Sequence, residues 1–537
     1  MKKHTIFLLA FLGFMVLYCP SLFAVRTNIT LNLIPYPQSV EVKQGACNLV
    51  QGFVVKGKSK NKGYLENILI QDFGLKPNKK GKVIHLLVDE HFSANKEAYQ
   101  LHIDDVGITI VAGAENGIFY GIQTLRQLVD EGKLPCVVIK DHPAFGFRSY
   151  MLDEARYFQG TETVKMLLDE MAQLKFNKFH WHLTNDSGWR IAIKKYPLLT
   201  EIGSRRDSSQ IDDNGKKWSS ELFDGKVHQG FYTQEEIKDI IKYAEERYIT
   251  IIPEISMPGH ASAAVASYPW LGTLTDKITI PTKFGVASTV FNPADERVIN
   301  FLHDVLKEVS ELFPSDIIHI GGDEVKYDQW KESAEVTKYM AKYSLPTYSD
   351  VQVKFTNDIS NYIDSELHKK MMGWNEILGK QVHDWSTAKN SETDLSPNAI
   401  IHFWFGKSDI LQLAIDKGYQ VVNSHNVYTY LDYTYDLINL QKAYSFNPVP
   451  AGIKPEQRDQ VIGMGCQMWG EWTPTRKEIE YQTFPRIAAY AEVGWTSQNH
   501  KDYSRFRNGL QKLMNGWESK GYRIASLAVA EIVDKTN

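Results

Sequence analysis

Short apolar runs alternate with amphipathic segments over most of the chain beyond residue 142. Between several of these runs the apolar spacing is helical, and in 233–248 Thr233 and Glu236 form a predicted capping box. The runs themselves predict eight strands, at 149–155, 177–183, 249–255, 316–322, 370–376, 399–405, 420–425 and 461–469. Eight strands alternating with helices over about 350 residues indicate an α/β fold, a (β/α)8 TIM barrel.

A smaller unit precedes the predicted barrel. Two strand-like runs and one helical run compose it, at 83–90, 108–112 and 117–129. The stretch 140–148, which contains Pro and Gly, marks the boundary, and the last segment predicts a helix at 503–525 packed on the barrel. We therefore predict three parts: an N-terminal α+β domain over 33–141, the catalytic barrel over 142–500 and a C-terminal helical segment over 501–537.

The first 24 residues have the pattern of a secretory signal. Two lysines precede an apolar run from Ile6 to Tyr18, and Ala24 offers a small residue for cleavage. The run is shorter than the roughly 20 residues that span a bilayer. Lipidation at Cys19 is disfavoured because Tyr18 before it is bulky. We expect cleavage after Ala24 and export to the periplasm, the cell surface or the medium.

The composition argues against a nucleic-acid-binding protein, a membrane-spanning protein and a disulfide-stabilised one. Lys and Arg total 60 against 64 Asp and Glu, so the net charge of −4 gives no long-range field for nucleic acid, and no segment after the leader predicts a membrane span. Cleavage would leave three cysteines, Cys47, Cys136 and Cys466, too few and too scattered for a disulfide framework. The 12 Trp and 27 Tyr exceed what a core of this size requires. Some of these aromatic side chains are therefore candidates for ligand contact.

Polar and aromatic residues gather at the carboxyl ends of the predicted strands, where TIM barrels build their sites. The candidates are Arg156, Asp186, His260, Asp323, Glu324, Trp374, Trp404, Tyr430, Asp432, Trp469 and Glu471. The strongest local signal is Gly321-Gly322-Asp323-Glu324, which ends an apolar strand. Two adjacent carboxylates repel each other, and the glycines allow another group to approach the backbone.

This pair of carboxylates predicts an unusual kind of glycosidase. An ordinary retaining enzyme places its acid and its nucleophile on opposite sides of the scissile bond, about 5–5.5 Å apart. Neighbouring strand residues instead point to opposite faces of a strand. The pair is better suited to one acid and one group that orients a nucleophile supplied by the substrate, such as an N-acetyl group.

Seven motifs surround these residues: MLDEARYF at 151–158, HWHLTNDSGWR at 180–190, PEISMPGHA at 253–261, HIGGDE at 319–324, MMGWNEI at 371–377, YLD at 430–432 and MWGE at 468–471. In kind and order they resemble the motifs of glycoside hydrolase family 20, the β-N-acetylhexosaminidases. The similarity runs from about Ile34 to the C-terminal helix and includes the small domain before the barrel.

The resemblance implies an exo-acting retaining glycosidase that removes terminal β-linked GlcNAc or GalNAc from an oligosaccharide or glycan. It implies substrate-assisted catalysis through an oxazolinium intermediate. Glu324 would be the general acid and base, Asp323 would orient the acetamido group, and the Tyr430 hydroxyl would bind the acetamido oxygen. No cofactor or metal ion is expected.

The remaining candidates take binding and tuning roles by the same resemblance. Arg156, Asp432 and Glu471 would hold the sugar hydroxyls, which suits an Arg fork and acceptor carboxylates. Three tryptophans, Trp374, Trp404 and Trp469, would form aromatic walls around the sugar. His260 and Asp186 would tune the acid, whose pKa is expected to be raised toward neutrality.

The chain departs from the family pattern at three positions. Ser256 and Asn375 stand where the family usually or often has Asp, and Asn185 replaces an acidic residue before Asp186. The acid, its neighbour and the tyrosine are intact. We therefore expect activity to be retained and the pH optimum to be affected.

Other functions stay open. A metal-dependent barrel hydrolase is one. His180 and His182 alternate on one strand and share a face, and together with His260, His319 and Asp323 they offer the donor atoms of a binuclear metal site. A glycan-binding protein without catalysis is another. Within the family, a lacto-N-biosidase or an enzyme for sulfated GlcNAc is an alternative, and the sugar preference, the natural glycan and the oligomeric state are undetermined.

Overall fold

The computed structural model describes residues 31–274 and 276–532. From Asn32 onward the chain forms one compact unit. The predicted signal sequence, residues 1–24, lies outside the described residues. Cys47, Cys136 and Cys466 are free and buried. Of the helices in the described ranges, none is both long and apolar enough to cross a bilayer.

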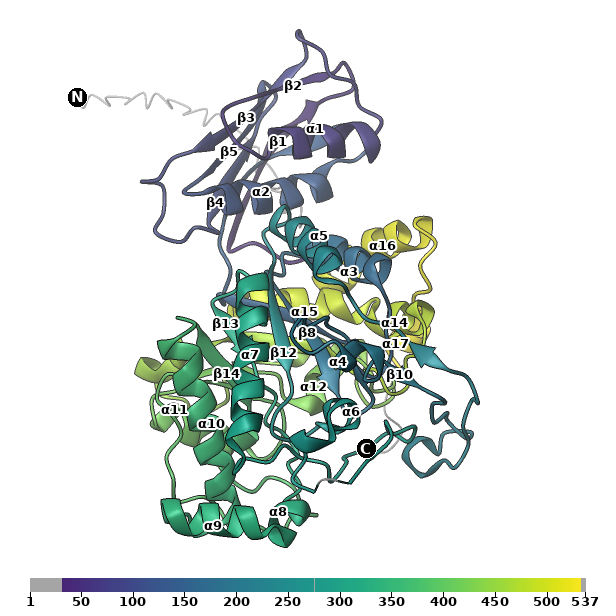
Figure 1. Cartoon of the computed structure of the whole chain (residues 1–537). Helices are drawn as coiled ribbons and strands as arrows, with labels where there is room; N and C mark the ends of the chain where they lie inside the picture. The colour runs from purple at the N-terminus through teal and green to yellow at the C-terminus, as the bar shows by residue number, and fades with distance from the viewer. Residues whose placement is uncertain (1–30, 275, 533–537) are drawn as a thin grey trace, which may run out of the picture. The chain divides into compact units, whose positions relative to one another are not determined.

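The segment before the barrel is a six-stranded mixed sheet with two helices on one face (Figure 1). Its strands have the order β1-β6-β4-β5-β3-β2. Helices α1 (Lys62–Gln71) and α2 (Glu115–Leu128) cover the sheet. The strands are β1 (Ser39–Asn48), β2 (Phe53–Lys56), β3 (Lys82–Val88), β4 (Tyr99–Ile103), β5 (Gly107–Ala112) and β6 (Lys133–Asp141).

A closed barrel of eight parallel strands forms the larger part, and all eight predicted strands are confirmed. The strands follow each other around the barrel in chain order, and pairing between the second and third strands completes the circle. They are β7 (Phe147–Asp153), β8 (Lys178–Asn185), β12 (Thr250–Ile255), β13 (Ile317–His319), β14 (Lys370–Trp374), β15 (Ile400–Phe403), β16 (Gln420–Asn423) and β17 (Val461–Met468). The α/β barrel prediction is therefore correct.

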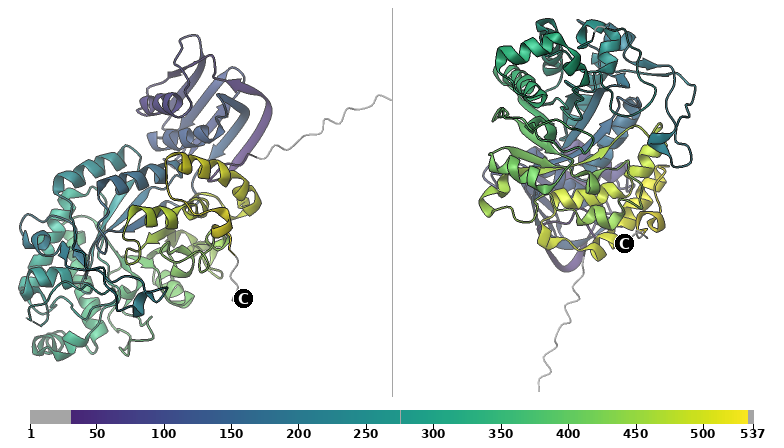
Figure 2. Two further views of the ribbon diagram at one scale, coloured as in Figure 1. Left: turned by 90° about the vertical axis from the view of Figure 1, so that its right-hand side faces the viewer. Right: turned by 90° about the horizontal axis from the view of Figure 1, so that it is seen from below.

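Helices surround these strands (Figure 2). The longer ones are α3 (Thr161–Gln173), α5 (Gln234–Glu245), α7 (Glu296–Leu312), α9 (Ala334–Tyr343), α10 (Tyr348–Ser365), α11 (Ser408–Asp416), α14 (Arg476–Thr483), α15 (Arg486–Trp495) and α16 (Tyr503–Ser519). The short ones are α4 (Leu198–Glu201), α6 (Ser262–Ser267), α8 (Asp328–Glu332), α12 (Asn426–Thr429), α13 (Leu440–Ser445) and α17 (Leu527–Ala530).

The remaining strand pieces are short and lie outside the barrel proper. The pieces are β9 (Gly188–Trp189), β10 (Arg205–Arg206) and β11 (His228–Gln229). The antiparallel pair β10 and β11 belongs to the long segment between β8 and α5.

Local sequence signals explain where several elements begin and end. The capping box predicted at α5 is present, with Thr233 accepting from Glu236 N and the Glu236 side chain returning to the cap. The fourth barrel strand ends at His319, earlier than the predicted 322, because Gly321 and Gly322 have positive φ. The helix predicted at 503–525 is α16, which ends earlier, at Ser519, and Gly521 follows with φ of 77°.

The barrel interior changes character along its axis. Its lower layer is an apolar cluster that contains Phe147, Ile252, Ile317, Met372, Ile400 and Val422. Toward the carboxyl ends the buried side chains become polar, with His180, His319 and His402 around Glu254. The apolar layer supplies the core, and the polar layer supports the catalytic face above it.

Candidate active site

The turn after β13 places Asp323 and Glu324. Gly321, Gly322 and Glu324 all have left-handed φ, of 69°, 88° and 54°. A Cβ on Gly322 would lie 2.4 Å from Ile377, and one on Gly321 would lie 3.3 Å from Glu254 Oε1, so both positions require glycine. We expected the two carboxylates to alternate on a strand, and this prediction was wrong. The strand ends before them, and the turn directs both toward one histidine.

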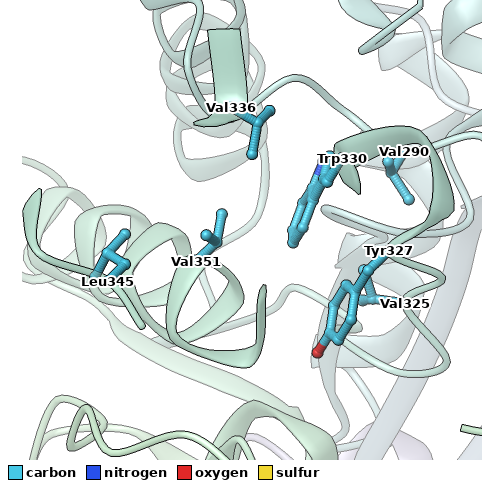
Figure 3. Packing of buried hydrophobic residues seen from close by; sticks show 7 residues of the cluster. All are labelled: Val290, Val325, Tyr327, Trp330, Val336, Leu345 and Val351. Carbon is cyan, nitrogen blue, oxygen red and sulfur yellow. The ribbon is translucent and has the colours of Figure 1, made fainter. Parts of the chain in front are cut away.

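A hydrophobic cluster beyond the turn holds this loop in place (Figure 3). Val325, which follows the acid directly, and Tyr327 are both buried in it. The Tyr327 ring stacks on Trp330 at 5.4 Å with 12° between the planes. The position of Glu324 is therefore fixed by packing on its C-terminal side and by glycine conformation on its N-terminal side.

His260 joins the two carboxylates to Asp186. Its Nε2 lies 3.5 Å from Asp323 Oδ2 and 3.4 Å from Glu324 Oε2, and its Nδ1 lies 2.8 Å from Asp186 Oδ2. Burial lowers the pKa of His260, but the charge of Asp323 and the bonds to the carboxylates outweigh it, so the pKa lies well above its usual value. The imidazole is therefore a cation at neutral pH.

The pKa of Glu324 moves opposite to our expectation. Burial raises it, but the contact with His260 and its positive charge outweigh burial, and the pKa lies below the usual value of a glutamate. The carboxyl is thus ionised at neutral pH. The prediction of a raised pKa was wrong because His260, which the sequence named as a tuning residue, lies with its charged ring 3.4 Å from Glu324 Oε2 and lowers the pKa.

Aromatic rings form one side of the site. The rings of Trp404 and Tyr430 are parallel at 5.9 Å, and the Trp469 ring lies 5.9 Å from Tyr430. Trp374 is only 1% exposed and contacts Trp404 and Trp469 from behind, with Nε1 donating to Glu254 Oε1 at 3.0 Å. Trp374 thus packs against the aromatic wall and is not among the residues that line the cavity.

A second group of charged residues faces the aromatic wall. Arg156 Nη1 donates to Asp153 Oδ2 at 2.8 Å, and its Nε lies 3.1 Å from Glu471 Oε1. Its guanidinium also lies 5.0 Å from the centre of the Trp469 ring. Burial and the neighbouring Glu471 raise the pKa of Asp432 to about 8, and burial raises that of Glu471.

These side chains line a cavity of about 610 Å³. Eight of the predicted residues line it: Arg156, Asp323, Glu324, Trp404, Tyr430, Asp432, Trp469 and Glu471. Asp323 Oδ1, Asp432 Oδ1 and Trp469 Nε1 are buried and have no hydrogen-bond partner among the described residues. Unpaired buried polar atoms are rare in native proteins, and three around one cavity indicate a polar ligand.

Eight of the residues that line the cavity were missed from the sequence, and three of them carry a charge or an indole ring. Lys217, Trp218 and Trp472 also line the cavity. Trp218 and Trp472 meet edge to face at 5.4 Å, and Trp218 is 56% exposed. The first two lie on the long segment after β8, which has no regular pattern, whereas Trp472 directly follows Glu471 and could have been included.

The residues that depart from the family pattern are satisfied within the protein. Ser256 donates from N and Oγ to Thr184, at 3.0 and 2.9 Å. Asn185 Oδ1 accepts from Asp186 N at 2.7 Å, and Asn375 Oδ1 accepts from Trp404 N at 3.0 Å. Each therefore acts as a local hydrogen-bonding group beside the site.

The histidines of the metal alternative are engaged with protein groups. His180, His319 and His402 bring ring nitrogens within 4.8 Å of one another, as do the donor atoms of His260, Asp323 and Glu324. His180 Nε2 lies 2.7 Å from Glu254, His319 Nδ1 accepts from Gly321 N, and His402 Nε2 bonds Ser424. These contacts favour a role in holding the barrel interior.

Comparison with known families agrees with this geometry. The model of the glycosyl hydrolase family 20 catalytic domain matches residues 145–498, and that of domain 2 of the same family matches residues 30–142. The chain belongs to glycoside hydrolase family 20. The resemblance inferred from the motifs is thus confirmed.

The chain is similar to proteins named as β-hexosaminidases. A β-hexosaminidase of Porphyromonas gingivalis is 36% identical over 79% of this chain and 54% of its own length, so the chain spans about half of that protein. One from Vibrio furnissii is 33% identical over 87% of this chain and 76% of its own length. The exo-β-N-acetylglucosaminidase of Vibrio harveyi, solved with N-acetylglucosamine, superposes with a TM-score of 0.79 at 30% identity, covering 92% of this chain and 78% of that one.

Proposed function

We propose that this family 20 glycoside hydrolase is an exo-acting β-N-acetylhexosaminidase. It would remove terminal β-linked GlcNAc or GalNAc from oligosaccharides or glycoconjugates with retention of configuration. The observation that carries the proposal is the position of Asp323 and Glu324, both within 3.5 Å of His260 at the edge of an aromatic-walled cavity. The activities named for the Porphyromonas, Vibrio furnissii and Vibrio harveyi proteins support it.

In the first step, protonated Glu324 donates its proton to the glycosidic oxygen. The acetamido carbonyl oxygen of the substrate attacks C1, and the bond from C1 to the leaving oxygen breaks. Asp323 accepts the acetamido N–H and stabilises the positive charge of the oxazolinium ion. The Tyr430 hydroxyl donates to the acetamido oxygen and orients it for attack.

In the second step, ionised Glu324 takes a proton from a water molecule. The water oxygen bonds to C1, and the bond between C1 and the acetamido oxygen breaks, which restores the β configuration. Because His260 lowers the pKa of Glu324, the base form is abundant at neutral pH and the acid form requires a lower pH. We therefore expect an acidic pH optimum.

The rest of the cavity suits a terminal pyranose. Arg156, Asp432 and Glu471 offer donors and acceptors for its hydroxyls, and Asp432, with a pKa of about 8, is a neutral carboxyl that both donates and accepts. Trp404 and Trp469 supply apolar faces, with Trp374 behind them.

The test compares wild type with Glu324→Gln. Wild type is expected to release 4-nitrophenol from the aryl β-N-acetylglucosaminide, and the variant to lose about 10²–10⁴-fold in kcat. The loss should be larger for the β-1,4-linked GlcNAc disaccharide, whose leaving hydroxyl needs a proton. Glu456→Gln is the matched control, because Glu456 is an exposed glutamate that does not line the cavity. An inactive wild type, or a variant equal to it, would overturn the proposal.

We further propose that the protein is exported. The support is the signal-like pattern of residues 1–24, which ends in Ala24. Mass spectrometry of the protein from each cell fraction is expected to find a chain that begins at Val25 outside the cytoplasm. An intact chain that starts at Met1 and stays in the cytoplasm would contradict export.

A further inference from the structure

A second hollow, of about 430 Å³, adjoins the catalytic cavity on the side of Glu324. Val286 lines both spaces. Val325, next to the acid in the chain, lines the hollow, and Glu324 and Trp385 together line a small pocket between the two. The hollow thus lies beside the residue that follows the catalytic acid, and the small pocket connects it with Glu324.

Trp385 presents an aromatic face to this hollow. Its indole is 49% exposed and stacks on the His383 ring at 5.0 Å with 16° between the planes. His383 also stacks on Phe405 at 5.0 Å and 14°. A half-exposed indole that is held by stacking on a neighbouring ring is suited to stacking against the apolar face of a sugar.

Contacts within the protein connect this platform to the catalytic wall. His383 Nε2 lies 2.9 Å from Glu376 Oε1, and Glu376 Oε2 accepts from Trp404 Nε1 at 2.9 Å. On the other side, Lys326 Nζ donates to Val286 O at 2.8 Å and lies 5.9 Å from the Trp385 ring. The platform and the shared wall are thus both anchored before a ligand arrives.

We propose that this hollow is the subsite for the leaving sugar, a pyranose on the reducing side of the scissile bond, with Trp385 as its stacking platform. The inference rests on the proposed function, since Glu324 must donate to the oxygen that joins the two sugars. A leaving sugar therefore extends from the acid, toward Val325 and Trp385. Trp385 would thereby select substrates by the residue next to the terminal N-acetylhexosamine.

The catalytic cavity, as distinct from the hollow, offers a tryptophan for a matched control. Trp218 is 56% exposed and also belongs to an irregular segment, but it lines the catalytic cavity near Trp472 and is not among the residues of the hollow. If Trp385 is the platform, truncation of Trp218 leaves the leaving sugar's contribution unchanged.

The experiment measures kcat and KM for two substrates, the β-1,4-linked GlcNAc disaccharide and the β-methyl glycoside of GlcNAc, whose leaving group has no ring. Trp385→Ala is expected to raise KM for the disaccharide about tenfold and to leave the methyl glycoside within about twofold of wild type. Trp385→Phe is expected to restore most of the loss, and Trp385→Leu is not. Trp218→Ala is expected to change the ratio between the substrates by less than about twofold.

Several results would overturn the subsite. These are a Trp385→Ala variant with an unchanged KM for the disaccharide, equal losses for both substrates, or a disaccharide-specific loss in Trp218→Ala. Failure of the proposed function is distinct, because then wild type would hydrolyse neither substrate. Trp385→Leu keeps an apolar side chain without a ring, so the test does not depend on one truncation.

Discussion

The two walls of the catalytic cavity hold their carboxyl groups in opposite electrostatic states. On the wall of Glu324, the pKa values of Glu324 and Asp186 are lowered by contacts with His260 that outweigh burial. On the wall around Arg156 burial prevails: the pKa of Asp432 rises to about 8, and that of Glu471 is also raised. The two sets of carboxyl groups at the cavity thus differ in the direction of their pKa shifts, and the cations beside them cause the difference.

The difference follows from how each cation is used. His260 contacts three carboxylates at 2.8 to 3.5 Å. Arg156 is occupied by Asp153 and Glu471, and Asp432 Oδ1 has no hydrogen-bond partner within the described ranges. Negative charge is therefore concentrated where the oxazolinium cation would form, and neutral carboxyls remain where sugar hydroxyls would bind. The placement of cations, more than burial, therefore sets the pKa of each carboxyl group and with it the role that the group can take.

Asp323→Asn is expected to have the largest effect on this comparison. The amide keeps the shape of the side chain but removes the charge that stabilises the oxazolinium ion, so kcat should fall about 10²–10³-fold with KM little changed. Steady-state kinetics on the aryl glycoside measure both values. Asp459→Asn, an exposed carboxylate outside the cavity, serves as control. A tenfold or smaller loss would mean that the charge of Asp323 is not central.

His260→Gln tests the cause of the lowered pKa. Without the imidazolium, the pKa of Glu324 should rise, so the acid form should persist to higher pH and the basic limb of kcat/KM should move upward. The measurement is the pH profile of kcat/KM for wild type and variant. His500→Gln, an exposed histidine, should leave the limb in place. A limb that stays fixed or moves to lower pH would contradict the role of His260.

The smallest effects are on stability, and the two walls should give opposite signs. The folded-state pKa of Asp432 is raised, so the carboxyl ionises at lower pH in the unfolded chain than in the folded one, and the resulting loss of stability grows as pH rises from the unfolded pKa toward about 8. Asp432→Asn should therefore raise Tm by about 1–2 °C at pH 7, and by less at pH 5. The pKa of Asp186 is lowered, so its contribution is present at pH 7 and is lost as pH falls through that pKa.

Asp186→Asn should accordingly lower Tm at pH 7, with the difference shrinking in acid. Thermal unfolding of both variants and wild type at pH 5 and pH 7 gives the comparison directly. Shifts of the same sign in both variants would show that the two walls do not differ as described.

Much of the fold could be predicted because the barrel strands carry continuous apolar runs bounded by clear breaks. The strand at 461–469, predicted from such a run, spans Val461–Met468. The strand predicted at 316–322 was too long, since the conformation of Gly321 and Gly322 depends on the packing of Ile377 and Glu254 around them. That packing is distant in sequence and leaves no local pattern.

The site was predictable where a motif follows an apolar run and not where a loop carries no motif. Asp323 and Glu324 were chosen because they follow an apolar run, and Asp432 was chosen from the YLD motif on the loop after the seventh strand; all three line the cavity. Trp218 and Trp385 lie on irregular segments, so neither a period nor a motif distinguishes them from other surface residues. The sequence also could not predict the direction of the Glu324 pKa, which depends on the distance to His260 in the folded chain.

The central claim is that the acetamido group of the substrate acts as nucleophile between Asp323 and Tyr430. The most direct test is inhibition by a thiazoline analogue of N-acetylglucosamine, which resembles the oxazolinium intermediate. The claim predicts competitive inhibition at least about 10²-fold stronger than by N-acetylglucosamine itself, and much weaker inhibition by an analogue without the acetamido-derived ring. Equal inhibition by the two analogues would contradict substrate assistance.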